Sequence, residues 1–556
     1  GLDSALMSER APSLLDATCE DFVYDLAELS PTLATELGIS GHDDQLQDFS
    51  PEHWNDIADR IRDLIADVDA LHDGTDASDD EDDFDEVDYV TSAILRDRMM
   101  VELELHHRGE NLRMLNNVTS PVQIIRNALT VMPKDTEEDL HNLAERMLCV
   151  RRSLAGYRES LAEAAGQGDV ASQRQIDAVI SQCEALAEDG SLLESMGLDV
   201  DSEPVSQAKY AFAEMADWLS TELAPLASHE DSVGRERYEL FSQFFLGREI
   251  DLDEAYAWSL DALARIVERQ QDVARDLFDG ECTARGAYRR LDEDPNYTLT
   301  DNDLLVEWMQ KVSDQMIGRL DGEMFTLPEE LKHLDCRVDA AGTGGMMYTP
   351  PSEDLLRPGI LWWSVPQGQD GFHAWHELAR ICHEGVPGHH VQQGIAMTQR
   401  NTLNLWRRTL NWNAAYGEGW AVYAETLMED LGFFDDPGYR MGLLDSLRMR
   451  LARVAVDIGV HLHKKTPDGT GHWDASYAKA FLRDNTAMNE QNLGFELDRY
   501  MGWPGQATSY ALGYRDWMDL REKAREKGMT LREFHDKALR LGSMPMDMLA
   551  REVLCR

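Results

Sequence analysis

The stretch His383-Glu384-Gly385-Val386-Pro387-Gly388-His389-His390 contains three of the 17 histidines of the chain. Two more, His373 and His376, precede it closely. Proteins bind a catalytic zinc ion through neutral imidazoles and activate its water with a nearby carboxylate that is not a ligand. The stretch therefore predicts a metal site, with Glu384 as the general base, and it makes the helices around it the centre of the fold.

The spacing of these histidines differs from that of the common zinc helix. In His-Glu-x-x-His, one helical turn places both imidazoles on the same face. Here the next histidines lie six and seven positions beyond His383, too far around or along an unbroken helix to share one ion. Pro387-Gly388 interrupts the helix and allows a bulge that returns a ligand to the site. This geometry favours His389 and leaves His390 as the alternative.

A second helix, predicted over residues 411–431, is expected to supply the third ligand. Glu418 and Glu425 are seven residues apart, so they share one face of it, among small or apolar neighbours. A buried carboxylate is costly unless it is paired or bound to a metal. We expect Glu418 to be the third ligand and Glu425 to orient another ligand, with salt bridges to arginines as the alternative for both.

Two further groups of polar residues are candidates. Asp457 and His461 are four residues apart on one helical face. We expect Asp457 to orient a ligand or anchor His461, and His461 to contact substrate, with an internal polar pair as the alternative. Tyr510, and after it Tyr514, are candidates to contact the substrate and donate a hydrogen bond to its oxyanion, with helix packing as the alternative.

Most of the chain is predicted to be helical, because apolar residues recur at three- and four-residue spacing, as in residues 89–112 and 137–165. Two apolar, aromatic runs separated by prolines predict a small β element near residues 345–365. The length of 556 residues favours two lobes. We expect a mainly α fold with an N-terminal helical lobe over residues 1–240 and a metal-bearing lobe over 241–556, or one continuous fold.

Composition makes several classes of partner and location unfavourable. Acidic residues outnumber basic ones by 104 to 52, so neither nucleic acid nor an anionic membrane is expected to bind. No apolar run is long enough to span a membrane, and Gly1 to Leu15 lacks the charge order of a secretory signal. The seven cysteines are dispersed, which predicts a reducing compartment, the cytoplasm.

These motifs resemble the bacterial family called domain of unknown function 885. The resemblance extends over nearly the whole chain, and the run from His383 to His390 is its most specific part. It also includes residues 31–38, Glu418-Gly-Trp-Ala421, residues 453–461 and residues 504–510. The family is distantly similar in fold to thermostable carboxypeptidases, oligopeptidases and angiotensin-converting enzyme, which are helical bodies with a deep channel between two lobes.

The resemblance has two implications for the site. In those peptidases a Gly-His pair completes the zinc helix, so the similarity aligns Gly388-His389 and supports His389 over His390. A strand edge beside that helix holds the substrate backbone, which implies this role for residues 346–349, including Tyr348, or for residues 360–364. Strand addition supplies main-chain hydrogen bonds with little sequence preference.

Together these features predict a metal-dependent hydrolase, a zinc peptidase that acts on short peptides or small amides. His383, His389 and Glu418 are the expected ligands, and another divalent transition metal is the alternative to zinc. Hydrolysis of a non-peptide amide or ester at the same metal is the alternative reaction. The alternative from another class is a catalytically silent protein that binds metal or peptide.

Overall fold

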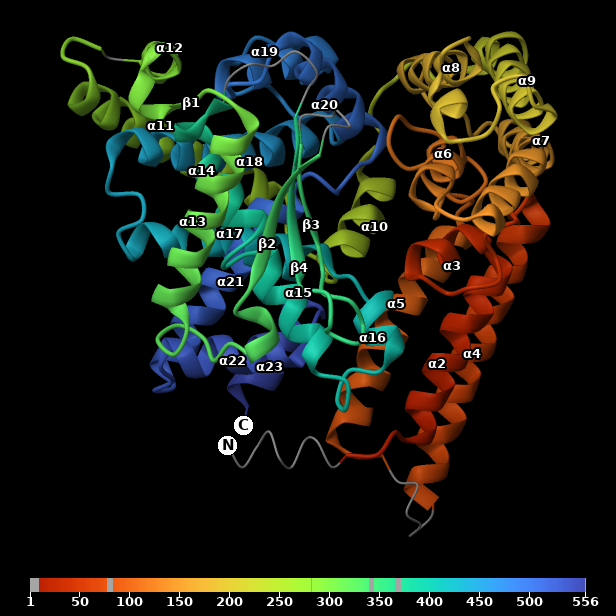
Figure 1. The fold of residues 1–556 in the computed structure, drawn as a ribbon, viewed down its shortest axis with the longest axis horizontal. Coiled ribbons are helices and arrows are strands. Elements are labelled where there is room, and N and C mark those ends of the chain that lie inside the picture. The colour runs from red at the N-terminus through yellow and green to blue at the C-terminus, as the bar shows by residue number, and fades with distance from the viewer. Residues whose placement is uncertain (1–9, 78–83, 282, 340–344, 366–371, 556) are drawn as a thin grey trace.

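The computed structural model describes residues 10–77, 84–281, 283–339, 345–365 and 372–555, which form a mainly α-helical molecule (Figure 1). The expected mainly α fold is confirmed. The sequence from Gly1 to Leu15 was not predicted to be a secretory signal, and its residues 1–9 lie outside the described residues. Among the helices in these ranges, none is both long and apolar enough to cross a membrane.

The N-terminal helices form two groups (Figure 1). Three long helices pack side by side, namely α2 (Leu14–Leu29), α4 (Pro51–Ala77) and α5 (Glu86–His107). A bundle follows, made of α6 (Pro121–Val131), α7 (Glu137–Gly166), α8 (Gln173–Ala187) and α9 (Glu203–Trp218). The short α3 (Pro31–Leu37) contacts both groups, and α10 (Arg235–Leu246) packs on α5.

The C-terminal helices surround α14 (Ala374–Glu384), which packs on α17 (Ala414–Asp430) and α18 (Pro437–His461). α17 also lies along α21 (Ser509–Glu526), and α18 lies along α11 (Leu252–Leu277). The other helices are α12 (Ala284–Glu293), α13 (Asn302–Leu320), α15 (His389–Thr398), α16 (Leu405–Thr409), α19 (Ala475–Asn485), α20 (Glu490–Gly502), α22 (Leu531–Leu541) and α23 (Met546–Leu554).

A three-stranded sheet has the order β2 (Leu334–Asp339), β4 (Gly359–Ser364) and β3 (Met346–Thr349). β4 runs parallel to β2 and antiparallel to β3, with Tyr348 opposite Leu361. The predicted β element near residues 345–365 is therefore present, and β2 adds a strand that was not predicted. Because β4 is paired on both sides, the expectation that residues 360–364 hold a substrate backbone is wrong. β3 lies at the edge of the sheet, and β1 (Thr298–Leu299) pairs with β5 (Phe372–His373).

The buried apolar residues form two large cores, and N-terminal residues contribute to both. The larger core combines residues of α2, α4 and α5 with residues from most of the C-terminal helices. The second core lies within residues 49–223, among α6, α7, α8 and α9. The first 240 residues thus contribute to both cores, and the proposed division near residue 240 stays a prediction.

A cavity of about 530 Å³ lies between N-terminal and C-terminal elements. Residues of α4, α5, α8 and α10 and the segments 110–119 and 501–504 line it, among them Trp54, Arg113, Phe244 and Trp503. None of its lining residues is a predicted metal ligand. The deep channel that was expected to lead to the metal site therefore stays a prediction.

Gly419 of α17 and Gly513 of α21 lie directly against each other. A Cβ atom on Gly419 would lie 2.4 Å from the carbonyl carbon of Gly513. A Cβ atom on Gly513 would lie 2.4 Å from the carbonyl oxygen of Ala415. Because the obstructing atoms belong to the backbone, the two helices can pack at this distance only when both positions lack a side chain. The close crossing places Gly513, which lies one turn after Tyr510, against the residue that follows Glu418.

Replacement of Gly419 by alanine is expected to destabilise the fold by about 1–3 kcal/mol, because the added methyl group forces two backbones apart. The matched control is Gly494→Ala in α20, where a Cβ atom would meet nothing within 4 Å. That substitution is expected to stabilise the protein slightly, because alanine is the better helix former. Thermal unfolding followed by circular dichroism measures both changes, and equal midpoints for the two variants would contradict the packing argument.

Candidate metal centre

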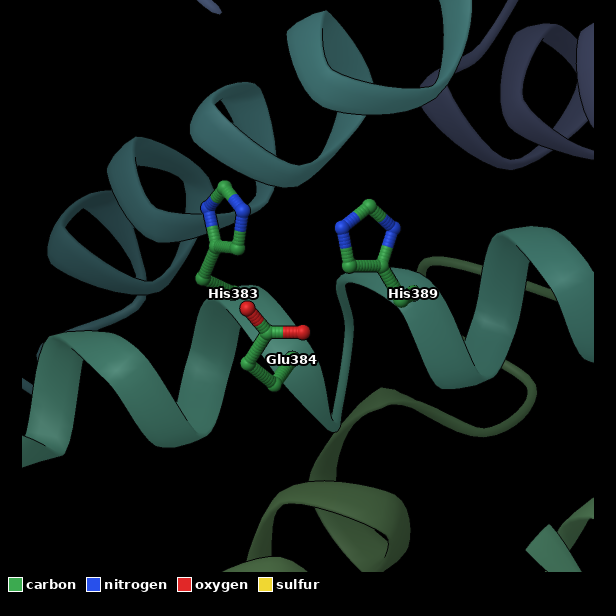
Figure 2. Close-up of side chains that lie close together, drawn as sticks. All are labelled: His383, Glu384 and His389. Carbon is green, nitrogen blue, oxygen red and sulfur yellow. The ribbon is translucent and has the colours of Figure 1, made fainter. Parts of the chain in front are cut away.

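The side chains of His383, Glu384 and His389 form one cluster, in which their potential ligand atoms all lie within 4.8 Å of one another. Figure 2 shows the two imidazoles side by side, with the carboxylate of Glu384 directed towards the gap between them. The ring centroids of His383 and His389 are 5.0 Å apart. α14 ends at Glu384 and α15 begins at His389, so the helix is interrupted where Pro387-Gly388 predicts it.

The Pro-Gly insertion folds tightly against the last turn of α14. The amide of Gly388 donates to the carbonyl oxygen of Cys382 at 2.9 Å. A Cβ atom on Gly388 would lie 1.9 Å from the carbonyl oxygen of His383, so only glycine fits here. The indole of Trp420 in α17 donates to the carbonyl oxygens of Pro387 (2.9 Å) and Gly388 (3.2 Å). Tertiary contacts thus fix the bulge that returns His389 to the site.

Glu418 joins the two histidines from α17. Its carboxylate oxygens lie 3.2 Å from Nε2 of His383 and 3.4 Å from Nε2 of His389. Burial would raise the pKa of Glu418, but the interactions with His389 and His383 outweigh it and hold this pKa well below its usual value. The three residues predicted as ligands therefore present two imidazole nitrogens and a carboxylate to one point.

Glu425, two turns after Glu418, fixes the ring of His383. It lies 3.0 Å from Nδ1 of His383 and accepts hydrogen bonds from Arg450 and Ser446, each at 2.9 Å. Burial and the Arg450 cation would lower the pKa of His383, but the hydrogen bonds to Glu418 and Glu425 raise it to about 9. Glu425 thus has the predicted orienting contact and also the arginine partner that was the alternative.

The donor set fits zinc. Catalytic zinc is commonly bound by two histidines and a carboxylate, with a carboxylate behind one histidine to orient it. Nδ1 of His389 is buried and has no hydrogen-bond partner among the described residues. Among the described residues, the polar contact of this ring is therefore made by its Nε2, which faces Glu418.

His390 has a different environment from His389. Its Nε2 donates to the carbonyl oxygen of Leu331 at 2.9 Å, and its Nδ1 accepts from the hydroxyl of Tyr348 at 2.7 Å. Gly359 leaves room for this contact, because a Cβ atom there would lie 2.5 Å from the Tyr348 hydroxyl. Burial lowers the pKa of His390 to about 4. The geometry favours His389 as the ligand, and the predicted substrate contact of Tyr348 stays a prediction.

Asp457 and His461 lie outside the cluster, so the expectation that Asp457 orients a metal ligand is wrong. The two side chains lie 3.8 Å apart, as expected for the alternative, an internal polar pair, and the substrate contact of His461 stays a prediction. His461 accepts from the amide of Val233 and lies 2.9 Å from the carbonyl oxygen of Tyr500. Asp457 accepts from the hydroxyl of Tyr238 at 2.6 Å. His461 is about three helical turns, or roughly 16 Å, beyond the part of α18 that contacts Glu425. Their shared face was correctly inferred, but it belongs to an internal polar group.

The two tyrosine candidates of α21 separate in the structure. The ring of Tyr510 stacks on that of His383, with a centroid distance of 6.3 Å and an interplanar angle of 26°. Tyr514 follows one turn later and interacts with Thr426, beyond Glu425 on α17. Burial raises the pKa of Tyr514, and the Thr426 hydroxyl partly offsets this. Tyr510 therefore lies beside the cluster, whereas the substrate contact predicted for Tyr514 stays a prediction.

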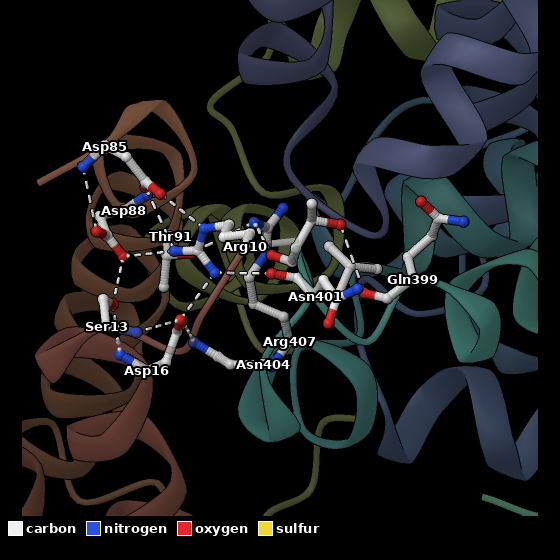
Figure 3. A network of polar contacts seen from close by, with 12 residues as sticks. Arg10, Ser13, Asp16, Asp85, Asp88, Thr91, Gln399, Asn401, Asn404 and Arg407 are labelled. Carbon is white, nitrogen blue, oxygen red and sulfur yellow. Dashed lines mark hydrogen bonds and ion pairs between the residues drawn. The ribbon is translucent and has the colours of Figure 1, made fainter. Parts of the chain in front are cut away.

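A polar network joins the N-terminal helices to the segment between α15 and α17 (Figure 3). Arg10 forms an ion pair with Asp16 at 2.9 Å, and Asn404 donates to the same carboxylate at 3.1 Å. Arg407 of α16 donates to the hydroxyl of Thr91 in α5 at 3.3 Å. These contacts hold the segment that connects the helices of His389 and Glu418. The sequence carries no sign of these contacts, because partners so far apart along the chain leave no local pattern.

The model of the family described as "Bacterial protein of unknown function (DUF885)" matches residues 31–553. A crystal structure of a "putative lipoprotein" from Colwellia psychrerythraea has a TM-score of 0.81 at 20% identity and covers 98% of this chain and 99% of its own. A "putative lipoprotein of unknown function" from Shewanella oneidensis has a TM-score of 0.73 at 17% identity and covers 97% of this chain and 99% of its own. At these identities the similarity shows a shared fold.

A carboxypeptidase from Pyrococcus furiosus covers 85% of this chain and 96% of its own at 11% identity. Its TM-score is 0.33, which is too low to carry an argument about this chain. No curated protein matches the sequence significantly.

Glu425→Gln is expected to weaken zinc binding about 10- to 100-fold, because the amide orients His383 less strongly than a carboxylate does. The matched control is Glu429→Gln, one turn further along α17, where the carboxylate pairs with Arg269 at 2.7 Å. Competition with a chelating dye measures both affinities. Unchanged zinc affinity in Glu425→Gln would contradict the orienting role.

Proposed function

Because the chain belongs to the bacterial family of unknown function whose model covers residues 31–553, we propose its activity from the site: it is a metal-dependent hydrolase that cleaves short peptides. The observation that carries the proposal is the convergence of His383, His389 and Glu418, with the carboxylate of Glu384 beside both imidazoles. The two imidazoles are buried and the two carboxylates partly buried, and such ligand groups brought together from three helices are suited to bind a cation.

His383, His389 and Glu418 would hold the metal, which we propose to be zinc. Three protein ligands leave one position for water. Bound there, zinc would supply a Lewis acid and lower the pKa of that water towards neutrality. Nitrogen and oxygen ligands also suit other divalent transition ions, so metal analysis of the purified protein has to establish the identity of the ion.

Glu384 is the proposed general base. Its carboxylate lies beside both imidazoles. The carboxylate of Glu418, in contrast, faces the Nε2 atoms of both rings. Glu384 would accept a proton from the attacking water and deliver it to the leaving amine. Tyr510, stacked on His383, would donate its hydroxyl proton in a hydrogen bond to the oxyanion. Glu425 keeps the His383 ring in place throughout.

The edge strand β3 supports a peptide as the substrate. Tyr348 of β3 is hydrogen-bonded to His390, which is adjacent to the proposed ligand His389. The edge of β3 is therefore tied to the helix that carries the metal ligand. A peptide backbone could add to this edge through main-chain hydrogen bonds, whereas a small non-peptide amide or ester would gain nothing from it.

We also propose that the protein acts in a reducing compartment, the cytoplasm. The six cysteines that the structure describes are all free, and four of them are buried. This pattern is typical of proteins that are not built around disulfides.

Glu384→Gln is expected to lower kcat/KM on short peptides by about 10²- to 10⁴-fold, the usual contribution of general acid–base catalysis. Zinc content should be unchanged, because the proposal assigns no ligand role to Glu384. The control is Glu377→Gln on the same helix, where the carboxylate pairs with Arg380, and it should retain activity. Rates on a defined peptide mixture and zinc per protein are measured together.

Two outcomes would contradict this account of the site. Full peptide cleavage by Glu384→Gln would remove Glu384 as the base. A zinc-loaded wild type without turnover on any peptide, amide or ester would support a silent binding protein instead.

A further inference from the structure

Three arginines gather beside Tyr510. Arg450 and Arg453 come from α18, and Arg499 comes from α20. The guanidinium carbons of Arg450 and Arg453 lie 5.3 and 5.1 Å from the centre of the Tyr510 ring. The three arginine side chains are only 8%, 10% and 11% exposed. A concentrated buried positive charge is unexpected in a chain with a net charge of -52.

The carboxylates around this group do not balance its charge. Glu425 accepts from Arg450 at 2.9 Å. Glu496 binds Arg499 at 2.7 Å and lies 3.6 Å from Arg453. Among the described contacts, two carboxylates form ion pairs with three guanidinium groups, while Glu418 and Asp457 act on Arg450 and Arg499 from beyond ion-pair distance. Burying a cation is unfavourable unless an anion accompanies it, so the group has capacity for one more anion.

Two details indicate which donors remain available. Nε of Arg450 is buried and has no hydrogen-bond partner among the described residues. Arg453 donates from Nε to the hydroxyl of Tyr500 at 2.6 Å, and its contact with Glu496 is longer than a hydrogen bond. Arg499, in contrast, is satisfied by Glu496 and by Gln506, which accepts from it at 2.7 Å. Arg450 and Arg453 therefore have unused donors next to Tyr510.

The position of the group relates it to the reaction. Tyr510 stacks on His383 and also contacts Arg450 and Arg453, so one aromatic ring separates the metal cluster from the arginines. An extended peptide advances about 3.5 Å per residue. A bound peptide therefore needs only about one to three residues to reach from the metal cluster to the guanidinium groups.

We propose that Arg450 and Arg453, with Arg499 adding positive charge beside them, form a subsite for a substrate carboxylate, an assignment that rests on the peptidase function proposed above. Guanidinium groups bind carboxylates through paired, charge-assisted hydrogen bonds. The carboxylate is either the free C-terminus of the peptide or an acidic side chain just beyond the scissile bond. In both cases the protein selects a substrate with a negative charge a short distance from the metal, against the repulsion of its own net charge.

The test measures binding of three probes to zinc-loaded Glu384→Gln protein by calorimetry. The probes are N-acetyl-trialanine with a free carboxylate, its C-terminal amide, and an amidated analogue with Asp as the last residue. We expect the amide to bind roughly 10- to 100-fold more weakly than the free acid, the usual effect of losing hydrogen bonds to a charged group. If the amidated Asp probe binds as tightly as the free acid, the subsite accepts an acidic side chain as well as the C-terminus.

Arg453→Gln, made in the same Glu384→Gln background, is expected to abolish the preference for the carboxylate probes and to leave binding of the plain amide unchanged. Arg453→Lys should retain part of the preference, because it keeps the charge and loses the paired donors. The matched control is Arg448→Gln on the same helix, where the guanidinium donates to Asn485 and Gln270 instead. Circular dichroism and zinc content establish that each variant is folded.

Three results would overturn the subsite. One is equal or undetectable binding of all three probes. Another is a carboxylate preference that persists in Arg453→Gln, which would place the carboxylate on the zinc. The third is an equal loss of all three probes in Arg453→Gln, which would indicate a packing role. Because binding is measured without turnover, failure of the subsite is distinct from failure of the proposed hydrolase, which shows instead as a wild type without activity.

Discussion

The site depends on the position of His383 between two carboxylates of one helix. Glu425 holds its Nδ1 and Glu418 faces its Nε2, at 3.0 and 3.2 Å. The two carboxylates are two helical turns apart, so α17 presents both to the same ring. Glu425 is itself held by Arg450 from α18. The polar contacts of one imidazole thereby connect α14, α17 and α18, which also pack against one another.

The Pro-Gly insertion is tolerated because the surrounding fold accommodates it. Trp420 of α17 donates to the carbonyl oxygens of the insertion, and Gly388 packs against the backbone of α14. α17 also crosses α21 at Gly419. Glu418, Gly419 and Trp420 are three successive residues of one turn of α17. One turn of α17 therefore provides the proposed metal ligand, fixes the bulge and packs against α21, whose Tyr510 stacks on His383.

Periodicity and residue chemistry predicted the helical fold, the β element and the convergence of His383, His389 and Glu418. Seven-residue spacing on a helix places Glu418 and Glu425 on one face wherever that helix lies. Spacing could not assign Asp457 and His461, because a shared face does not specify which elements pack on it. Nor could it separate His389 from His390 by itself, since the partner of His390 is Tyr348 on a strand. The arginine group required α18 and α20 to be placed together in three dimensions.

X-ray absorption and anomalous diffraction at the zinc edge, on crystals of the zinc-loaded protein, test the central claim most directly. The account predicts one ion with two imidazole nitrogens and one carboxylate, from His383, His389 and Glu418, at about 2.0–2.2 Å. Glu384 should lie close to the ion without ligating it. An ion bound through His390, an ion elsewhere, or no anomalous signal at this site would contradict the account.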